Sequence, residues 1–464
     1  MNGLKEHGPS VLVAGLSSAF GVSLVATTGV LSQIIAGDDR ASASETVTMI
    51  LTFIAFVFIA IATYVGAVVT ANTFSTIVAG RARTIALLRL IGSSARTQRR
   101  AVATEGLVVG VTGSLLGALV GIAVTWGITT AGVAMDQIPD DAYTFVSPIA
   151  LLPVVTVVLT TWAASWIGSR RVLNVSPMEA TGAAQETSLD EAGRRRGRNV
   201  TALVLFVLGI GILLLGMVVG LVSPLGVLIG VVGGLLSFTG VVLGAAVIMP
   251  RALRITGRLF GSSATARLAA ENAVRYPERS ARTTIGLVIG VTLVTMFAVA
   301  VESYQAMIRA AQEAQPDVYQ GTDQILVITV VVFSVLMGFS ALIAAVGMVN
   351  NLSLNVLQRT RELGLLRALG FTARQIRTMI LAESAQLTLA AVIVGLLLGT
   401  FYGWAGAQSL LGSISGSPGL ITPAVPLVLV GVIVLAAVVL TAVASVAPSR
   451  RATRIAPVAA LAVQ

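Results

Sequence analysis

Two stretches of this sequence are nearly the same: RARTIALLRLIG at residues 81–92 and RTRELGLLRALG at residues 359–370. The second stretch is related to the first by an offset of 278 in the numbering, and the same offset continues downstream, where it pairs Glu105 with Glu383. Self-similarity at a fixed offset is the mark of an internal duplication. The chain therefore contains two copies of one unit.

The duplication reaches to the end of each copy. ASWIGSRRVLNVSPMEA at 164–180 resembles ASVAPSRRATRIAPVAA at 444–460, and the offset there is 280. Upstream of the quoted stretches, the offset of 278 pairs an apolar stretch at 47–71 with one at 325–349. Most of the 464 residues are thus covered by the two copies.

The composition is that of a membrane protein. Hydrophobic residues make up 56% of the chain, charged residues only 11%, and the mean hydropathy is +0.93. Lipid must therefore be the solvent for most of the chain. A membrane helix needs about 20 mostly apolar residues. Ten stretches meet this requirement: 11–34, 47–71, 104–130, 147–168, 200–222, 225–249, 284–305, 325–349, 380–405 and 424–447. The first is expected to be a retained span rather than a signal peptide, because no small-residue cleavage site stands out.

The basic residues favour one side of these spans. With the N-terminus in the cytoplasm, 28 of the 30 arginine and lysine residues fall in cytoplasmic segments, and only Arg40 and Arg309 fall outside. This bias predicts a multi-pass protein of a bacterial cell membrane with both termini in the cytoplasm. It also accounts for the net charge of +10, so no nucleic-acid partner is expected. The absence of cysteine excludes disulfides and cysteine–metal sites.

The predicted fold is an all-α polytopic membrane protein of ten transmembrane helices. Spans 1–4 and 7–10 form two four-helix repeats, and spans 5 and 6 are an inserted helix pair. Six spans separate the starts of the two copies, so both copies have the same orientation in the membrane. The expected divisions are 1–181 for the first unit, 182–199 for a cytoplasmic linker, 200–250 for the inserted pair, 251–283 for a cytoplasmic amphipathic segment and 284–464 for the second unit.

The quoted stretches predict a short cytoplasmic helix followed by a tight break. Leu363, Leu366 and Leu369 recur at helical spacing, and Gly370 follows as a stop signal. The spacing of Thr372 and Gln375 is that of a capping box, so a second helix is expected to start there and to continue into span 9.

The first copy repeats this plan with Gly92 and Ser94. Two interpretations of the short helix are open: it lies in the lipid headgroups, or it is presented to the groove of a cytoplasmic partner.

The run RTRELGLLRALGFTARQIRTMILAES, beginning at residue 359, resembles the core signature of FtsX/MacB-type ABC transporter permeases. The segment AENAVRYPERSARTTIGLVIG at 270–290 is similar to the element that precedes the first span of a unit in that family, and the two SRR endings resemble its terminal motif. The ten-span layout is similar to that of bacitracin-export-type permeases. Even the four longest outside segments, 35–46, 131–146, 306–324 and 406–423, are too short for the folded extracytoplasmic domain that relatives usually carry.

The resemblance implies that a cytoplasmic ABC ATPase dimer is the partner and that this ATPase binds ATP and Mg. No cofactor is expected in the chain itself, which has no GxxxxGK[ST] motif and is not expected to be an enzyme. The resemblance also implies that the quoted segments are coupling helices. The ATPase-coupling residues are then Arg83, Leu88, Arg89, Gly92, Arg361, Glu362, Leu366, Arg367, Leu369 and Gly370.

Two further groups of residues are candidates for function. An inner-interface group lies where spans leave the cytoplasm: Glu105, Glu383, Arg170, Arg171, Arg450 and Arg451. Its carboxylates either pair with nearby arginines or contact the ATPase. A substrate path between spans 2 and 8, flanked by spans 1 and 7, would be lined by Phe53, Phe56, Phe333, Phe339 and Glu302.

The expected function is a permease subunit that couples ATP hydrolysis in a separate ATPase to the export or extraction of a hydrophobic or amphipathic compound, by mechanical transmission. An FtsX-like signalling subunit for the cell envelope is the first alternative, although it needs an external docking surface. An ion-coupled secondary transporter is the second, and most of the predicted spans lack the mid-membrane ionisable group that such proteins use.

The orientation can be tested with single cysteines, because the natural chain has none. We expect cysteines at positions 40 and 140 to react with a membrane-impermeant thiol reagent in intact cells, and cysteines at 96 and 190 to stay unlabelled. Labelling at 96 without labelling at 140 would reverse the predicted topology.

Overall fold

The structure is a computed structural model, and its described part is helical. It covers residues 8–36, 91–135, 139–169, 196–260, 277–316, 369–414 and 419–454, together with scattered positions such as 57, 61, 64, 87–88, 337–342 and 416. No β-strand occurs among these residues. The prediction of an all-α fold is confirmed.

The regular elements follow the predicted spans. They are α2 (Gly8–Ala36), α5 (Ala95–Ala134), α6 (Leu151–Gly168), α9 (Arg196–Gly220), α10 (Gly226–Gly257), α12 (Pro277–Ala314), α15 (Ala373–Leu411) and α16 (Leu427–Arg454), with short 3₁₀ turns at Pro148–Ala150 and Arg258–Phe260. Seven helices in the described part are long and apolar enough to cross a membrane, and α16 contributes a shorter apolar stretch, Leu427–Val439. The protein is therefore a multi-pass membrane protein. The count of ten stays a prediction, because the stretches 47–71 and 325–349 lie largely outside the described residues.

Several helices are longer than the predicted spans. Helix α5 has 40 residues and α15 has 39. At 1.5 Å per residue each is about 60 Å long, twice the thickness of the hydrocarbon core. Hydropathy detects only the part of a helix that lies in lipid, whereas these helices continue into water through arginine-containing turns such as that of Arg96. The inserted pair is longer for the same reason, with α9 beginning at Arg196 and α10 reaching Gly257.

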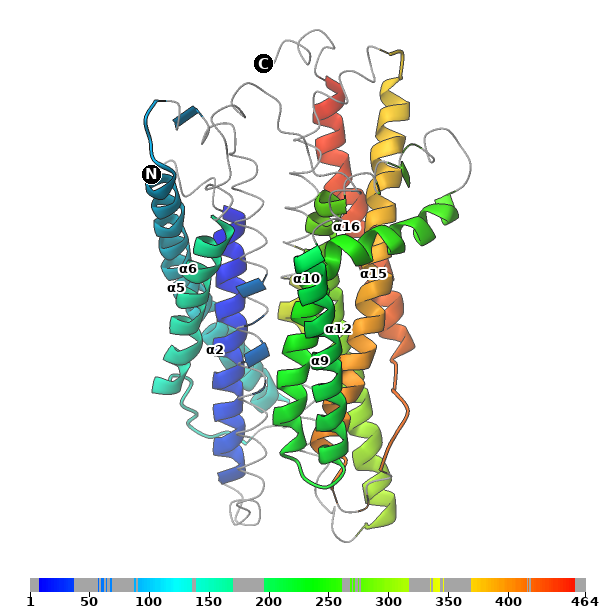
Figure 1. Cartoon of the computed structure of the whole chain (residues 1–464). Helices are drawn as coiled ribbons and strands as arrows, with labels where there is room; N and C mark the ends of the chain where they lie inside the picture. Colours follow the sequence, from blue (N-terminus) through cyan, green and yellow to red (C-terminus); the bar gives the residue numbers. More distant parts are fainter. Residues whose placement is uncertain are drawn as a thin grey trace.

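The helices form two groups that lie side by side (Figure 1). In one group α2 packs against α5, and α5 against α6. In the other, α12 packs against α15, α15 against α16, and the hairpin of α9 and α10 covers α12 and α15. The core joins the groups, since Phe20 of α2 lies 6.3 Å from Phe297 of α12 between ring centroids.

The duplication is visible in the packing of individual atoms. A Cβ placed on Gly117 of α5 would meet the Cβ of Ser18 and the amide nitrogen of Ala19. A Cβ placed on Gly395 of α15 would meet the Cβ of Val291 and the amide nitrogen of Thr292. The two glycines are related by the offset of 278, whereas their partners on α2 and α12 are related by an offset of 273. The two units therefore have the same helix packing, and the difference of five falls in the connections that follow α2 and α12.

Close backbone approach explains these glycines. Lipid is as apolar as leucine, so helices in a membrane associate through tight packing and hydrogen bonds rather than through the hydrophobic effect. In the first unit, the Ser18 hydroxyl donates to the Ser114 carbonyl oxygen at 2.9 Å, and the Ser23 and Thr125 hydroxyls lie 3.2 Å apart. The glycine rows that the sequence presents are packing surfaces in both units.

The inserted hairpin, α9 and α10, is attached to the second unit. Glycines at 209, 216, 233 and 240 bring α9 and α10 into backbone contact. The fully buried Gln386 side chain of α15 donates from Nε2 to the Leu253 carbonyl oxygen of α10 at 2.8 Å. The hydroxyls of Tyr402 and Ser237 are 2.9 Å apart and join the same two helices. Hydrogen bonds between helices in lipid are specific, so the hairpin occupies a defined position against α15.

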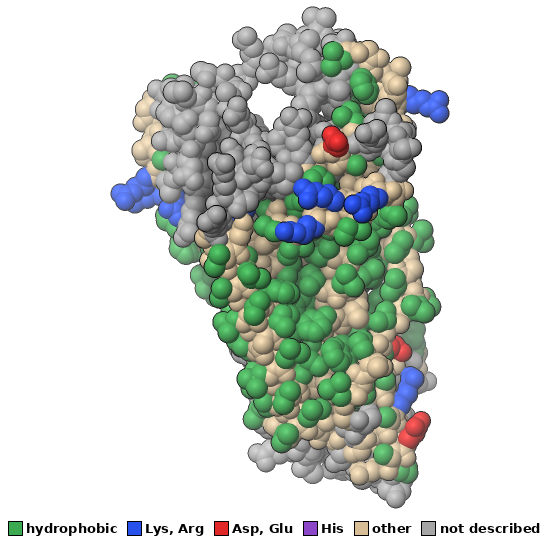
Figure 2. Space-filling model, turned by 45° about the vertical axis from the view of Figure 1, so that its right-hand side comes forward, with side chains coloured by type: hydrophobic (Ala, Val, Ile, Leu, Met, Phe, Trp, Pro, Cys, Tyr) green, Lys and Arg blue, Asp and Glu red, His purple; other side chains and the backbone are tan. Residues whose placement is uncertain are grey.

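The surface shows how the molecule sits in a bilayer. A broad hydrophobic band occupies the middle of the face in Figure 2, and arginine side chains gather mainly toward one end. Apolar side chains such as Leu119, Leu159 and Val207 are exposed on α5, α6 and α9, as expected of helices that face lipid. On α5 and α6, the Arg99 guanidinium lies 4.0 Å from the centre of the Trp166 ring, an arrangement suited to the membrane–water boundary.

Bulky substitutions in the glycine rows should loosen the two units. We expect Gly117→Leu and Gly395→Leu each to lower the free energy of unfolding by about 1–3 kcal/mol or more, because a side chain at either position would collide with backbone and Cβ atoms of the neighbouring helix. Unfolding of the purified protein in a titration of denaturing detergent measures the loss. Gly127→Leu in α5 is the matched control, since a Cβ there meets nothing within 4 Å. Equal effects at 117 and 127 would contradict this account of the packing.

Candidate functional site

The predicted coupling segments end in the same backbone conformation in both units. Gly92 has a φ of +101° and Gly370 a φ of +96°, in the left-handed region that favours glycine. In the first unit the Ser93 amide donates to the Leu88 carbonyl oxygen at 2.9 Å, across six residues. This is the hydrogen bond of a Schellman motif, which ends a helix at a glycine. The predicted stop signal at Gly92 is confirmed, and Gly370 has the matching conformation, although the residues just before it lie outside the described part of the chain.

The helices that follow are capped as predicted. The Ser94 hydroxyl accepts from the Thr97 amide at 3.1 Å. Thr372 and Gln375 form a full capping box: the Gln375 amide donates to the Thr372 hydroxyl at 3.2 Å, and the Thr372 amide donates to Oε1 of Gln375 at 2.8 Å. Each glycine therefore lies at a capped corner, two residues before the N-cap of a helix about 40 residues long.

An apolar residue stands exposed at each corner. Ile91 is 82% exposed and Leu369 is 70% exposed. They occupy the same place in the repeat, one residue before the glycine. Leu88 is partly buried, while Leu87 beside it is 50% exposed. Leu369 was predicted as a coupling residue; Ile91 was missed, although the offset of 278 that pairs Arg89 with Arg367 also pairs Ile91 with Leu369. The other predicted coupling residues lie outside the described part of the chain: Arg83, Arg89, Arg361, Glu362, Leu366 and Arg367.

The two carboxylates of the inner-interface group differ in burial. Glu383 is 7% exposed, whereas Glu105 is half-buried. Neither is without an interaction partner. Arg170 and Arg171 lie outside the described residues, and Arg450 and Arg451 lie in α16 with side chains that are not described. The repeat thus places equivalent carboxylates in different surroundings, with the deeper one in the unit that carries the hairpin.

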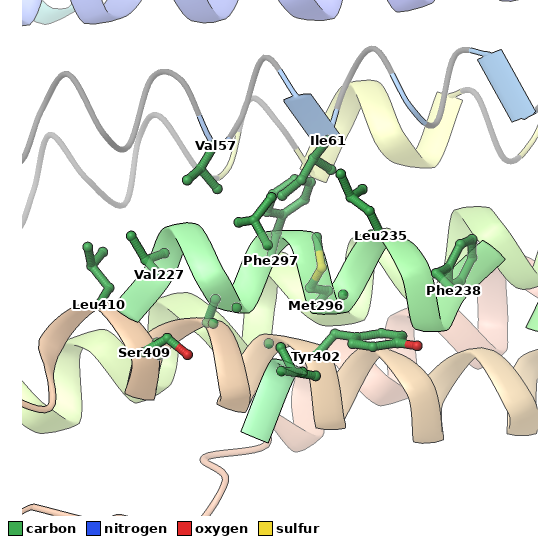
Figure 3. A pocket seen from close by; sticks show the side chains of 18 of the residues that line it. Val57, Ile61, Val227, Leu235, Phe238, Met296, Phe297, Tyr402, Ser409 and Leu410 are labelled. Carbon is green, nitrogen blue, oxygen red and sulfur yellow. The ribbon is translucent and has the colours of Figure 1, made fainter. Parts of the chain in front are cut away.

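A cavity of about 170 Å³ lies between span 2, the hairpin, α12 and α15 (Figure 3). Its wall is almost wholly apolar. Span 2 contributes Val57, Ile61 and Tyr64; the hairpin contributes residues from Leu213 and from Val227 to Phe238; α12 contributes Thr292 to Tyr304; and α15 contributes Tyr402 to Leu410. In Figure 3, Val227 and Leu410 lie at one end of the row of side chains and Phe238 at the other.

Most polar groups in the wall are already paired. The Tyr64 hydroxyl lies 2.8 Å from that of Thr239, and the Tyr402 hydroxyl pairs with Ser237. The Ser409 hydroxyl donates to the Ala405 carbonyl oxygen at 2.6 Å. Thr292 differs, since it is 2% exposed and its hydroxyl has no hydrogen-bond partner in the described part of the chain. The cavity is therefore suited to an apolar ligand.

Neither of the two described residues predicted for the substrate path, Phe339 and Glu302, lines the cavity. Phe339 is buried and meets Phe20 edge-on, with ring centroids 6.2 Å apart. Glu302 is exposed. Phe53, Phe56 and Phe333 lie outside the described residues. Sequence reasoning missed the cavity because about a third of its lining residues come from the hairpin, for which the repeat offers no template.

No cluster suited to a metal ion occurs among the described residues: nowhere do three histidine, aspartate or glutamate side chains gather. What the described structure offers is a pair of capped corners on one side of the bundle and an apolar cavity within it. These are the features of a membrane protein built from two permease-like units.

Comparison with known proteins agrees with this class. The FtsX-like permease C-terminal family matches two segments, residues 56–177 and 334–457. Together they make up more than half of the chain, so the protein belongs to the FtsX-like permease family. The starts of the two matches are related by an offset of 278 and their ends by an offset of 280, the same two offsets that the internal repeat shows.

A curated relative points the same way. The chain is 32% identical over 121 residues to an uncharacterized ABC transporter permease, YknZ, of Bacillus subtilis (strain 168). The match covers 26% of this chain and 28% of the relative. The similarity therefore concerns one stretch about as long as one matched permease segment.

The corners can be tested through their glycines. We expect Gly92→Ala and Gly370→Ala each to lower the free energy of unfolding by about 1 kcal/mol, because a side chain disfavours the left-handed conformation. Nothing lies within 4 Å of a Cβ at either position, so the loss reports on the backbone alone. Gly431→Ala in α16, which also meets nothing, should cause no loss. A stable Gly370→Ala protein would show that the corner is not held in this conformation.

Proposed function

We propose that this chain is the membrane-spanning subunit of an ABC transporter. It would couple ATP hydrolysis in a separate cytoplasmic ATPase dimer to the export or extraction of a hydrophobic or amphipathic compound. The chain itself would have no catalytic role. Membership of the FtsX-like permease family and the similarity to an ABC transporter permease of Bacillus subtilis support the class.

The observation that carries the proposal is the pair of equivalent corners. Gly92 and Gly370 have the same conformation, and each follows an exposed apolar residue, Ile91 or Leu369. An amphipathic segment that presents apolar side chains suits a groove on a partner. Two such segments on one chain suit a partner that is itself two-fold, as a pair of ATPase subunits is.

The mechanism would be transmission of movement. Closure of the two ATPase subunits on ATP would draw the corners together. Each corner is capped directly onto a helix of about 40 residues, and such a helix can carry a displacement through the whole thickness of the membrane. Because α2 and α12 pack on these helices through backbone contacts, they would move with them.

The first test is purification of the tagged chain from its native membrane. We expect a P-loop ATPase to co-purify with two copies per chain, and the complex to hydrolyse ATP. A chain that carries no ATPase under conditions that preserve its fold would contradict the proposal.

The second test places charge at both corners. In the double variant Ile91→Asp/Leu369→Asp, two carboxylates would be buried in the ATPase grooves without partners, at a cost of about 2–5 kcal/mol each. We expect the ATPase to be lost on purification while the chain stays folded. Val222→Asp is the matched control, because Val222 is 84% exposed and lies in the turn that joins α9 to α10, not at a corner. Full retention of the ATPase by the double variant would show that the corners do not hold it.

A further inference from the structure

We propose that the cavity between span 2, the α9–α10 hairpin, α12 and α15 binds one acyl chain of an amphipathic lipid. This inference goes beyond the proposed function, because binding needs neither ATP nor an ATPase. The ligand class follows from three features of the cavity: its lining, its length and its open glycines.

The lining selects an apolar ligand. The wall consists mainly of aliphatic and aromatic side chains, including Leu235, Met296 and Phe297, which surround the space in Figure 3. The hydroxyls of Tyr402 and Tyr64 are hydrogen-bonded to Ser237 and Thr239. Water needs several polar partners to occupy a cavity, so an apolar space of this kind stays dry and accepts apolar molecules. The surrounding solvent is itself made of acyl chains.

The length matches one leaflet. Along α10 the cavity extends from Val227 to Phe238, which is about 16 Å at 1.5 Å per residue. The hydrocarbon core of a bilayer is about 30 Å thick, so this is about half of it. The arginine bias assigns the Val227 end to the outer surface and the Phe238 end to the middle of the membrane. A lipid whose acyl chain enters tail-first from the outer leaflet would place its polar end beside Ser409 and Tyr304, at the outer end of the wall.

Two glycines keep the space open without serving helix packing. Gly234 of α10 and Gly406 of α15 line the cavity, and a Cβ on either would meet nothing within 4 Å. The neighbouring glycines Gly233 and Gly403 differ, because a Cβ on either would collide with backbone atoms of another helix. Glycine therefore occurs at two positions where a larger side chain would fill part of the cavity.

The experiment uses the purified full chain in lipid nanodiscs. The probes are a palmitic acid and a phosphatidylethanolamine, each with a photoactivatable diazirine in the distal half of an acyl chain. Labelled positions are mapped by mass spectrometry, and the dose dependence gives an apparent affinity. We expect saturable labelling of α10 between Val227 and Phe238 and of α12 between Thr292 and Tyr304. Labelling by the fatty acid alone would identify a single-chain amphiphile, and labelling by the phospholipid would identify a bilayer lipid.

Cavity-filling variants decide whether the label reports this site. Gly234→Leu and, independently, Gly406→Leu should weaken saturable labelling at least about tenfold, equivalent to about 1.4 kcal/mol. Gly211→Leu in α9 is the matched control: its Cβ also meets nothing within 4 Å, but Gly211 faces outward and does not line the cavity. Unchanged labelling in both filled variants would overturn the proposal. An equal loss in Gly211→Leu, or labelling confined to lipid-facing helices such as α6, would overturn it too.

A substitution at Thr292 tests in which direction the acyl chain of the ligand lies in the cavity. The unpartnered Thr292 hydroxyl lies at the mid-membrane end of the wall, where a tail-first ligand has only methylene and methyl groups. Thr292→Val should therefore leave the apparent affinity unchanged or raise it. A tenfold loss in this variant would mean that a polar group of the ligand reaches the deep end, and the proposed acyl chain would be wrong.

Discussion

The architecture depends on close contact between helix backbones in a solvent that gives apolar side chains no reason to cluster. In lipid, association rests on packing and on hydrogen bonds, so the residues with the smallest side chains determine which helices pair. Gly117 and Gly395 fill this role at the same point of the two units, and each meets the backbone of the first helix of its own unit. Once these pairs are formed, the capped corners at the start of α5 and α15 are placed on one side of the bundle.

Sequence reasoning succeeded wherever the deciding interaction is local. The stops at Gly92 and Gly370 and the capping box of Thr372 depend on neighbouring residues, so a pattern a few residues long is enough to predict them. The duplication was equally accessible, because each copy serves as a template for the other. The exposed corner residue Ile91 could have been found in the same way, by applying the offset of 278 to Leu369.

Sequence reasoning failed where the deciding interaction is distant. Gln386 and Leu253 are 133 positions apart, and nothing in either neighbourhood indicates that they meet. The position equivalent to Gln386 in the first unit is Val108, which is 47% exposed and has no such contact to make. The position of the hairpin against α15 depends on such distant contacts, and so does the cavity that the hairpin helps to form. The cytoplasmic ends of α5 and α15 were predicted from the capping residues Ser94 and Thr372 and not from hydropathy, which does not register helix in water.

The hairpin makes an otherwise two-fold molecule asymmetric. The packing of α2 on α5 repeats that of α12 on α15 almost atom for atom, and the corners match in conformation and exposure. A two-fold partner in the cytoplasm would therefore meet equivalent surfaces. Within the membrane the units differ, because the hairpin covers α12 and α15 and encloses a cavity there, while α5 exposes side chains such as Leu119 to lipid. An equal displacement of the two corners would then act on unequal surroundings within the membrane. A ligand bound only in the cavity of the second unit could therefore be moved even though the two corners move symmetrically.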